Sequence, residues 1–145
     1  MATREYRLKF WGVRGTVATP EPDKLRYGGN TACAAIEVAE DEFLILDCGT
    51  GARVLGDFLT EGRPRIPKRF HVLFTHYHLD HVEGLPFFTP LYDPTTTITF
   101  YGANSAGRTV QSILEGIMTP PYFPIPIGSS QSNKSYVVMD GSPLQ

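Results

Sequence analysis

Residues 75–81 read THYHLDH and contain three of the four histidines of this 145-residue chain. The motif directly follows the apolar run VLF at residues 72–74, which reads as the end of a buried strand. A solvated loop or a set of core histidines would be the simpler explanation. Four side chains of metal-ligand type within six positions at a strand end weigh strongly against it and indicate a metal site.

The spacing of the motif suggests how its side chains converge. Residues two apart in an extended segment point to the same side, so His76 and His78 can meet at one point while Tyr77 points elsewhere. If the chain then turns, Asp80 and His81 can face a second point close to the first. Mixed nitrogen and oxygen ligands suit Zn²⁺, with Mn²⁺ or Fe as alternatives, and two neighbouring metal ions are geometrically feasible.

Other residues of metal-ligand type are isolated along the chain. His71 stands alone near a strand start, so we expect it to have a structural role. The two cysteines, Cys33 and Cys48, do not form a CxxC pair, and we expect each to be a buried, reduced thiol. The site expected at residues 76–81 therefore depends on histidine and aspartate.

Alternating strand and helix patterns predict one α/β domain over residues 1–145, with a mixed sheet and helices packed on it. We expect strands at residues 5–13, 32–38, 43–47, 70–74 and 97–102, a possible last strand at 135–140, and helices at 49–62 and 105–118. The strand at 70–74 has the continuous apolar pattern of a strand buried on both faces. The proline-rich segment from residue 119 to 130 should be extended.

Composition narrows the function classes. A hydrophobic content of 41% is ample for a core, while a net charge of −2 lacks the basic excess of a broad nucleic-acid surface, which makes nucleic acid an unlikely partner. No apolar run reaches the roughly 20 residues that cross a bilayer, and the N-terminus lacks an apolar leader, so we expect a cytoplasmic protein that does not contact membranes.

Several segments resemble the metallo-β-lactamase superfamily in the same order along the chain. They are FWGVRGT, YGGNTAC, LDCGTGARVLG, THYHLDHVEGLPFF and PPYFPI, which together extend from Phe10 to about Ile127. The segments are similar to those of bacterial metal-dependent phosphodiesterases akin to ribonuclease Z. The resemblance implies an αββα sandwich and a hydrolase that uses a water activated between two metal ions, acting on a small phosphodiester or nucleotide-like substrate.

The resemblance also implies roles for individual residues. His76 and His78 would bind the first metal, and Asp80 and His81 the second. Asp80 would in addition orient the attacking water or relay its proton, as a catalytic residue. Asp47 matches the acidic residue of the D-x-G motif, which supports the site without binding metal.

Three further residues are candidates for the second shell or for substrate binding. Asn30 and Thr31 would line the pocket, although a tight glycine turn explains YGGN about equally well. Arg14 would pair with a substrate phosphate through its planar guanidinium, although a solvated or salt-bridged arginine is the commoner arrangement.

The chain departs from the family in one respect. Family members supply further histidine and aspartate ligands downstream, whereas this sequence has no histidine after His81. The chain thus matches the N-terminal half of the sandwich, and exposed apolar surface should drive it to form a homo-oligomer or to bind a missing C-terminal half. Two alternatives to the phosphodiesterase are a catalytically incomplete metal-binding half-domain and a hydrolase of thioesters, lactones or β-lactams with the same fold.

Overall fold

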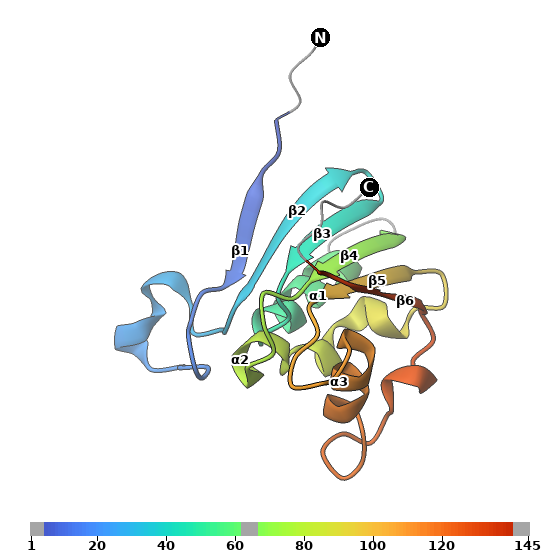
Figure 1. Ribbon diagram of the computed structural model, residues 1–145. Coiled ribbons are helices and arrows are strands. Elements are labelled where there is room, and N and C mark those ends of the chain that lie inside the picture. The colour runs from blue at the N-terminus through green and yellow to red at the C-terminus, as the bar shows by residue number, and fades with distance from the viewer. Residues whose placement is uncertain (1–4, 62–66, 141–145) are drawn as a thin grey trace.

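In the computed structural model, which describes residues 5–61 and 67–140, the chain forms one six-stranded mixed sheet with helices packed against it (Figure 1). The spatial order of the strands equals their order in sequence. They are β1 (Leu8–Gly12), β2 (Cys33–Ala39), β3 (Glu42–Leu46), β4 (Arg69–Leu73), β5 (Thr97–Gly102) and β6 (Asn133–Val138). The predicted α/β class and the strand positions are confirmed, with ends that differ by a few residues.

Strand direction brings the candidate site to one edge of the sheet. The strands β1, β2 and β3 are antiparallel neighbours, whereas β3, β4, β5 and β6 are parallel. Leu46, Leu73 and Tyr101 stand side by side in the register of β3, β4 and β5. The segments that follow these strands, including THYHLDH, therefore leave the sheet at the same edge, where ligand sites of open α/β sheets gather.

Three α-helices and four 3₁₀ helices connect the strands within the described residues. The α-helices are α1 (Gly51–Glu61), α2 (Leu79–Val82) and α3 (Val110–Ile117), and the 3₁₀ helices are η1 (Pro22–Tyr27), η2 (Leu85–Phe87), η3 (Thr89–Tyr92) and η4 (Ile127–Ser129).

Two predictions for the second half of the chain were partly wrong. The helix expected at residues 105–118 begins only at Val110, because Ala106 and Gly107 adopt positive φ, which excludes a right-handed helix there. Thr109 caps it, accepting a hydrogen bond from the Ser112 amide at 3.2 Å. The proline-rich segment is not extended throughout, since it contains η4.

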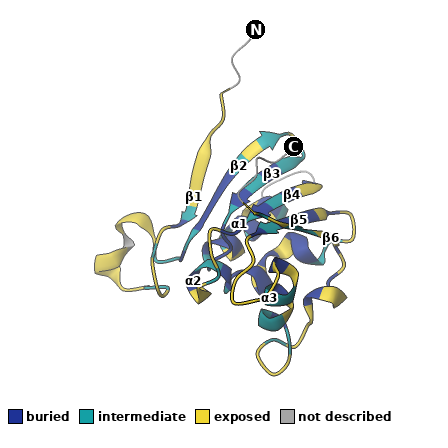
Figure 2. Cartoon of the chain, viewed as in Figure 1, coloured by how far each residue is buried: buried dark blue, intermediate teal, exposed yellow. Residues whose placement is uncertain are grey.

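The helices cover one face of the sheet. Alternate residues of the central strands, such as Phe43, Phe70 and Phe100, are almost inaccessible there and share one hydrophobic core with Leu55 of α1 and Leu114 of α3. The rings of Phe70 and Phe88 meet edge to face, 5.4 Å apart. Figure 2 shows this buried layer beneath the sheet. This face contributes the hydrophobic stabilisation of the fold.

The opposite face of the sheet, which we call the open face, is not covered by the described residues. Its register rows include Leu8, Ile36, Leu44 and His71 in one and Phe10, Ala34, Leu46, Leu73 and Tyr101 in the next. Phe10 is 63% exposed, and Leu44 and Leu73 are only partly buried. The prediction that residues 70–74 are buried on both faces was therefore wrong, because helices pack on one side only.

Two smaller points complete the fold. Within the described ranges, no helix has both the length and the apolar character needed to cross a membrane. Gly62, where the first helix was expected to end, lies outside the described residues.

Candidate metal centre

The candidate metal centre is assembled at the ends of two parallel strands. Directly after β3, Asp47 adopts φ 59°, which turns the chain sharply out of the sheet. The motif leaves β4, and the chain turns at once after His78, which precedes α2 in extended conformation. Backbone hydrogen bonds join the two strand ends, with Cys48 N–H donating to the His81 carbonyl at 2.8 Å. The turn that the spacing argument required is thus present.

The Asp47 carboxylate organises one side of this centre. Oδ1 accepts from the Thr75 amide and Oδ2 from the Thr75 hydroxyl, both at 2.8 Å. Oδ2 also lies 2.9 Å from Nδ1 of His81. A carboxylate only accepts, so Nδ1 of His81 donates, and in the neutral imidazole Nε2 then carries the lone pair. Asp47 thus makes the supporting contact that the resemblance assigned to it; metal binding by His81 stays a prediction.

Asp80 and His81 face each other at a distance that fits a shared metal ion. Asp80 Oδ2 lies 3.4 Å from His81 Nε2, which is longer than a strong charge-assisted hydrogen bond. Two ligands about 2.0–2.1 Å from one tetrahedral Zn²⁺ lie roughly 3.3–3.4 Å apart. The spacing and the chemistry of this pair therefore fit one edge of a zinc coordination sphere.

The main chain at Thr16 holds Asp80 from the other side. Thr16 N–H donates to Asp80 Oδ2 at 2.7 Å, across 64 residues of sequence. This hydrogen bond is the main reason why the pKa of Asp80 is lowered; burial opposes it and the nearby His81 and His76 add to it. Thr16 has φ 72°, a conformation that costs a β-branched residue about 1–3 kcal/mol. The sequence pattern did not suggest Thr16 as a site residue.

His76 and His78 form the more exposed part of the centre. Their ring centroids are 4.5 Å apart, and those of His76 and His81 are 4.0 Å apart. The Thr75 hydroxyl, which donates to Asp47, lies 3.1 Å from Nδ1 of His76, so that nitrogen donates, and in the neutral imidazole Nε2 then carries the lone pair. The three imidazoles thus gather in one place, as the motif predicts.

Tyr77 points away from the histidines and fastens the motif to the end of β5. Its hydroxyl donates to the Ala103 carbonyl at 2.7 Å, and its ring packs against Phe74. Gly102 leaves room for this, since a Cβ there would lie 2.1 Å from the Tyr77 hydroxyl oxygen. The alternation expected for residues 76–78 is confirmed, and Tyr77 ties the motif to the residue that follows β5.

The donor set is incomplete as a coordination sphere. Across residues 5–61 and 67–140, no group of three or more His, Cys, Asp or Glu side chains is arranged to hold a metal ion. The imidazole and carboxylate groups fit zinc in type, and the Asp80–His81 pair fits it in spacing. If two metal ions bind as expected, each would receive two ligands from the motif, so the described residues would supply part of each sphere.

Asn30 and Thr31 form a hydrogen-bonded network with Thr50 and Glu83. Thr31 is fully buried; its amide donates to the Thr50 hydroxyl at 2.8 Å, while Thr50 N–H donates back to Thr31 Oγ1 at 2.7 Å. The Thr50 hydroxyl donates to Asn30 Oδ1 at 3.1 Å, and Thr31 Oγ1 donates to Glu83 at 3.2 Å. Both residues thus hold the loops together, and sequence reasoning missed their partners Thr50 and Glu83. Their expected place in the lining of a substrate pocket stays a prediction.

Arg14 lies on the loop that carries Thr16. Its Nε donates to the Gly28 carbonyl at 3.2 Å, and its backbone forms an isolated parallel bridge with Thr31. The guanidinium is thus partly engaged with the chain itself. Its expected contact with a substrate phosphate stays a prediction.

His71 and the cysteines lie apart from the motif. On the open face, His71 Nε2 is 2.9 Å from Glu42 Oε1 and Nδ1 is 3.0 Å from the Tyr101 hydroxyl. His71 is the main cause, with Arg69 next, of a lowered Glu42 pKa. Cys33 and Cys48 are buried and not disulfide-bonded, and burial raises the Cys33 pKa to about 12. The structural roles expected for these residues are confirmed.

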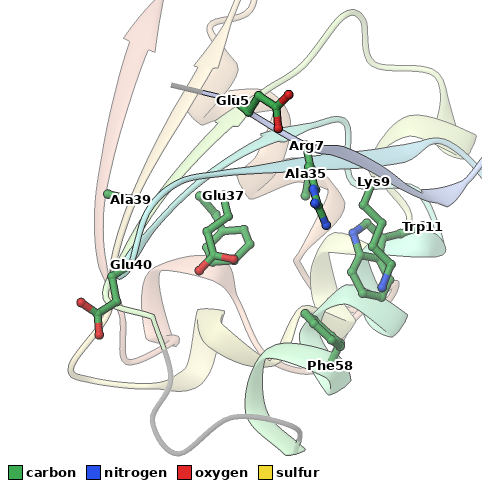
Figure 3. A pocket seen from close by; sticks show the side chains of 10 residues that line it. Glu5, Arg7, Lys9, Trp11, Ala35, Glu37, Ala39, Glu40 and Phe58 are labelled. Atoms are coloured by element: carbon green, nitrogen blue, oxygen red, sulfur yellow. The ribbon is translucent and has the colours of Figure 1, made fainter. Parts of the chain in front are cut away.

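One hollow among the described residues lies away from the candidate metal centre. It has a volume of about 560 Å³ and lies between β1, β2 and α1, with Trp11 and Phe58 on its wall (Figure 3). Lys9 reaches over the Trp11 ring, 3.9 Å from its centroid. None of the predicted site residues lines this hollow.

Comparison with known proteins agrees with this architecture. A family model described as the metallo-beta-lactamase superfamily matches residues 26–98, which include both strand ends and the whole motif. No curated protein sequence matches the chain significantly. The solved structure of Zn²⁺-bound PqqB from Methylobacterium extorquens is similar, with a TM-score of 0.57 and 16% identity over 94% of this chain. This chain covers 50% of that protein, and at this identity the likeness concerns the fold alone.

Proposed function

Since the chain belongs to the metallo-beta-lactamase superfamily, we propose that it is a metal-dependent hydrolase, of the phosphodiesterase branch related to ribonuclease Z. The observation that carries the proposal is the pair of Asp80 Oδ2 and His81 Nε2, 3.4 Å apart, with Asp47 behind the other nitrogen of His81. A carboxylate, an imidazole and a supporting carboxylate in this arrangement suit the activation of water.

The proposed chemistry assigns a task to each group of the chain. Metal ions, when bound, lower the pKa of water from 15.7 towards 7 and neutralise charge on a phosphoryl oxygen. His76 and His78 would hold one ion, and Asp80 and His81 the other. Asp80 orients the attacking water, and Asp47 fixes the ring and tautomer of His81. Arg14 is proposed to meet a substrate phosphate by a swing of its side chain away from Gly28.

The substrate proposal is a small or nucleotide-like phosphodiester. The net charge of −2 and the absence of a basic excess disfavour a long nucleic acid. The same fold with the same metals would serve a thioester, a lactone or a β-lactam, so the substrate must be decided by assay.

A catalytically incomplete metal-binding half-domain is the second candidate. The finding that favours it is that the described residues contain no group of three or more His, Cys, Asp or Glu side chains arranged to hold a metal ion. The open face also exposes apolar side chains such as Phe10, which disfavours a free monomer. We propose that further protein, either a second copy or a C-terminal half, packs on this face. A cytoplasmic location likewise stays a prediction.

Zinc titration followed by a turnover assay separates these candidates. The chain is titrated with Zn²⁺ and with Mn²⁺, then assayed on bis(p-nitrophenyl) phosphate, a chromogenic β-lactam and a thioester. The first candidate requires metal-dependent release from the phosphodiester that is lost in His81→Ala. His71→Ala is the matched control, because His71 is a histidine on the open face, bonded to Glu42 and Tyr101. Metal binding without turnover supports the half-domain, and turnover of another substrate alone rejects the phosphodiesterase.

A further inference from the structure

We propose that the backbone N–H of Thr16 is a positioning group of the metal centre, which fixes the Asp80 carboxylate in the orientation that binds metal. This inference rests on the proposed function, because it concerns how that site is built. It extends the site to the loop at residues 13–19, which lies more than fifty residues before the metal-binding motif.

The position of Asp80 Oδ2 is the first observation that supports this inference. The same oxygen accepts the Thr16 N–H at 2.7 Å and lies 3.4 Å from Nε2 of His81. A carboxylate oxygen has two lone-pair directions, so it can accept one hydrogen bond and still bind a metal ion. The amide therefore holds the carboxylate against rotation without occupying the lone pair on the His81 side.

The loop that carries Thr16 is fastened independently of Asp80. Before Thr16, the amides of Val13 and Arg14 both donate to the Asn30 carbonyl, at 3.0 and 2.9 Å. After it, Thr19 N–H donates to the Gly29 carbonyl at 2.8 Å. Both ends of the loop are thus tied to one turn. The Thr16 amide therefore has a fixed place and does not simply follow the carboxylate.

The backbone conformation of Thr16 is a further observation that supports this inference. At φ 72° a β-branched residue lies in the left-handed region, which threonine rarely adopts, and the surrounding structure must enforce it. Such conformations cluster at functional sites. Here the unusual φ belongs to the residue whose N–H reaches Asp80, and Asp80 is buried, so that its charge needs a donor.

An amide-to-ester exchange at Thr16 removes the N–H and keeps the side chain. The full chain is assembled by ligation of a synthetic 1–32 segment to Cys33, with threonine replaced by its α-hydroxy acid. The matched control is the same exchange at Ala18, whose N–H makes no hydrogen bond among the described residues. The measurements are the zinc dissociation constant, by competition with a chromophoric chelator, and the visible spectrum of bound Co²⁺.

We expect the Thr16 ester to bind zinc about 10- to 100-fold more weakly, as for loss of other outer partners of metal ligands, and to shift the Co²⁺ bands. The Ala18 ester should keep the affinity and the spectrum. If the hydrogen bond is purely structural, its loss should lower the unfolding temperature of the Thr16 ester and leave the Co²⁺ spectrum of the folded protein unchanged. That outcome overturns the inference. No metal binding by the unmodified chain overturns the proposed function as well.

A second measurement needs no variant. In isotope-labelled protein, the trans-hydrogen-bond coupling between the Thr16 amide nitrogen and the Asp80 carboxyl carbon is recorded before and after zinc is added. A coupling that persists with zinc supports the inference even if the ester fails to fold. Loss of the coupling on zinc binding overturns it, because the amide would then serve only the metal-free carboxylate.

Discussion

The two halves of the candidate metal centre differ in how firmly the chain holds them. The Asp80–His81 half lies against protein: Asp80 is buried, and the His81 side chain is 19% exposed. The Thr16 amide and the Asp47 carboxylate contact it from two directions. The His76–His78 half is exposed, and within residues 5–61 and 67–140 its imidazole nitrogens are contacted by the Thr75 hydroxyl beside His76.

The Asp80–His81 half is therefore the part of the candidate site that the described chain holds in place by itself. Ligands fixed before the metal arrives cost less ordering on binding, so a prepared pair binds more tightly than a mobile one of the same chemistry. The chain should therefore bind one zinc ion tightly at the Asp80–His81 half and a second one more weakly.

The largest effect is expected for His81→Ala. Loss of this ligand should weaken the tight zinc site by more than the roughly 100-fold upper value for an outer partner. His76→Ala should mainly remove the weaker binding event. Competition titration with a chelator resolves both events, with His71→Ala as the control histidine. If His76→Ala abolishes the tight event and His81→Ala spares it, the comparison is reversed.

The next effect is expected for Asp47→Asn. An amide nitrogen in place of Oδ2 cannot accept from His81 and the Thr75 hydroxyl, so the ring of His81 loses its anchor. Zinc affinity at the tight site should fall about 10- to 100-fold. Asp57→Asn on α1, which affects an exposed salt bridge with Arg53, is the matched control. Equal affinity of Asp47→Asn and the wild type would mean that Asp47 does not support the metal ligand.

Asp47 and His81 show how much of the site could be predicted from the sequence alone. Asp47 and His81 belong to short motifs that follow apolar strands, so their positions at one sheet edge follow from the pattern. Thr16, Thr50 and Glu83 could not be predicted, because their contacts depend on the paths of loops without a periodic pattern. Thr16 in particular reaches Asp80 across 64 residues.

Prediction of the fold from the sequence is limited by similar physical causes. Strands were recognised because their alternating or apolar runs reflect burial on the helix-covered face. The late start of α3 could not be predicted, because the positive φ of Ala106 is imposed by a turn and not by residue type. Partial exposure of His71 and Leu73 could not be read from the run at residues 70–74 either, because it depends on which layers pack on the sheet.

A smaller effect is expected for Tyr77→Phe. The variant loses the hydrogen bond to the Ala103 carbonyl and should destabilise the fold by about 0.5–1.5 kcal/mol. The variant should weaken zinc binding at the His76–His78 half, because Tyr77 lies between these histidines in the sequence. Zinc binding at the Asp80–His81 half should be unchanged. Denaturant unfolding and zinc titration measure the two effects, with the exposed Tyr122→Phe as control. An equal loss at both zinc events would show that Tyr77 does not act on one half alone.

The smallest effect concerns acid unfolding of the metal-free chain. The Thr16 amide lowers the pKa of Asp80 in the folded state below the ordinary value of 3.8. A lowered carboxyl pKa stabilises the fold above the unfolded-state value, and this stability is lost as pH falls through the folded-state value. As the pH falls below 3.8, the free energy of unfolding should therefore decrease less in Asp80→Asn than in the wild type. An unchanged acid profile would show that Asp80 contributes nothing there.

The distance along the chain between Thr16 and Asp80, and between Asp47 and His81, sets when the centre can form during folding. These contacts span 64 and 34 residues, and they require the parallel pairing of β3 with β4. Pairings between distant segments close late, because the entropy of the intervening loops is lost first. Metal capture should therefore follow folding of the sheet, in contrast to zinc fingers, whose folding requires the ion. An isolated peptide of residues 70–85 would keep every histidine of the motif and still lack the tight site.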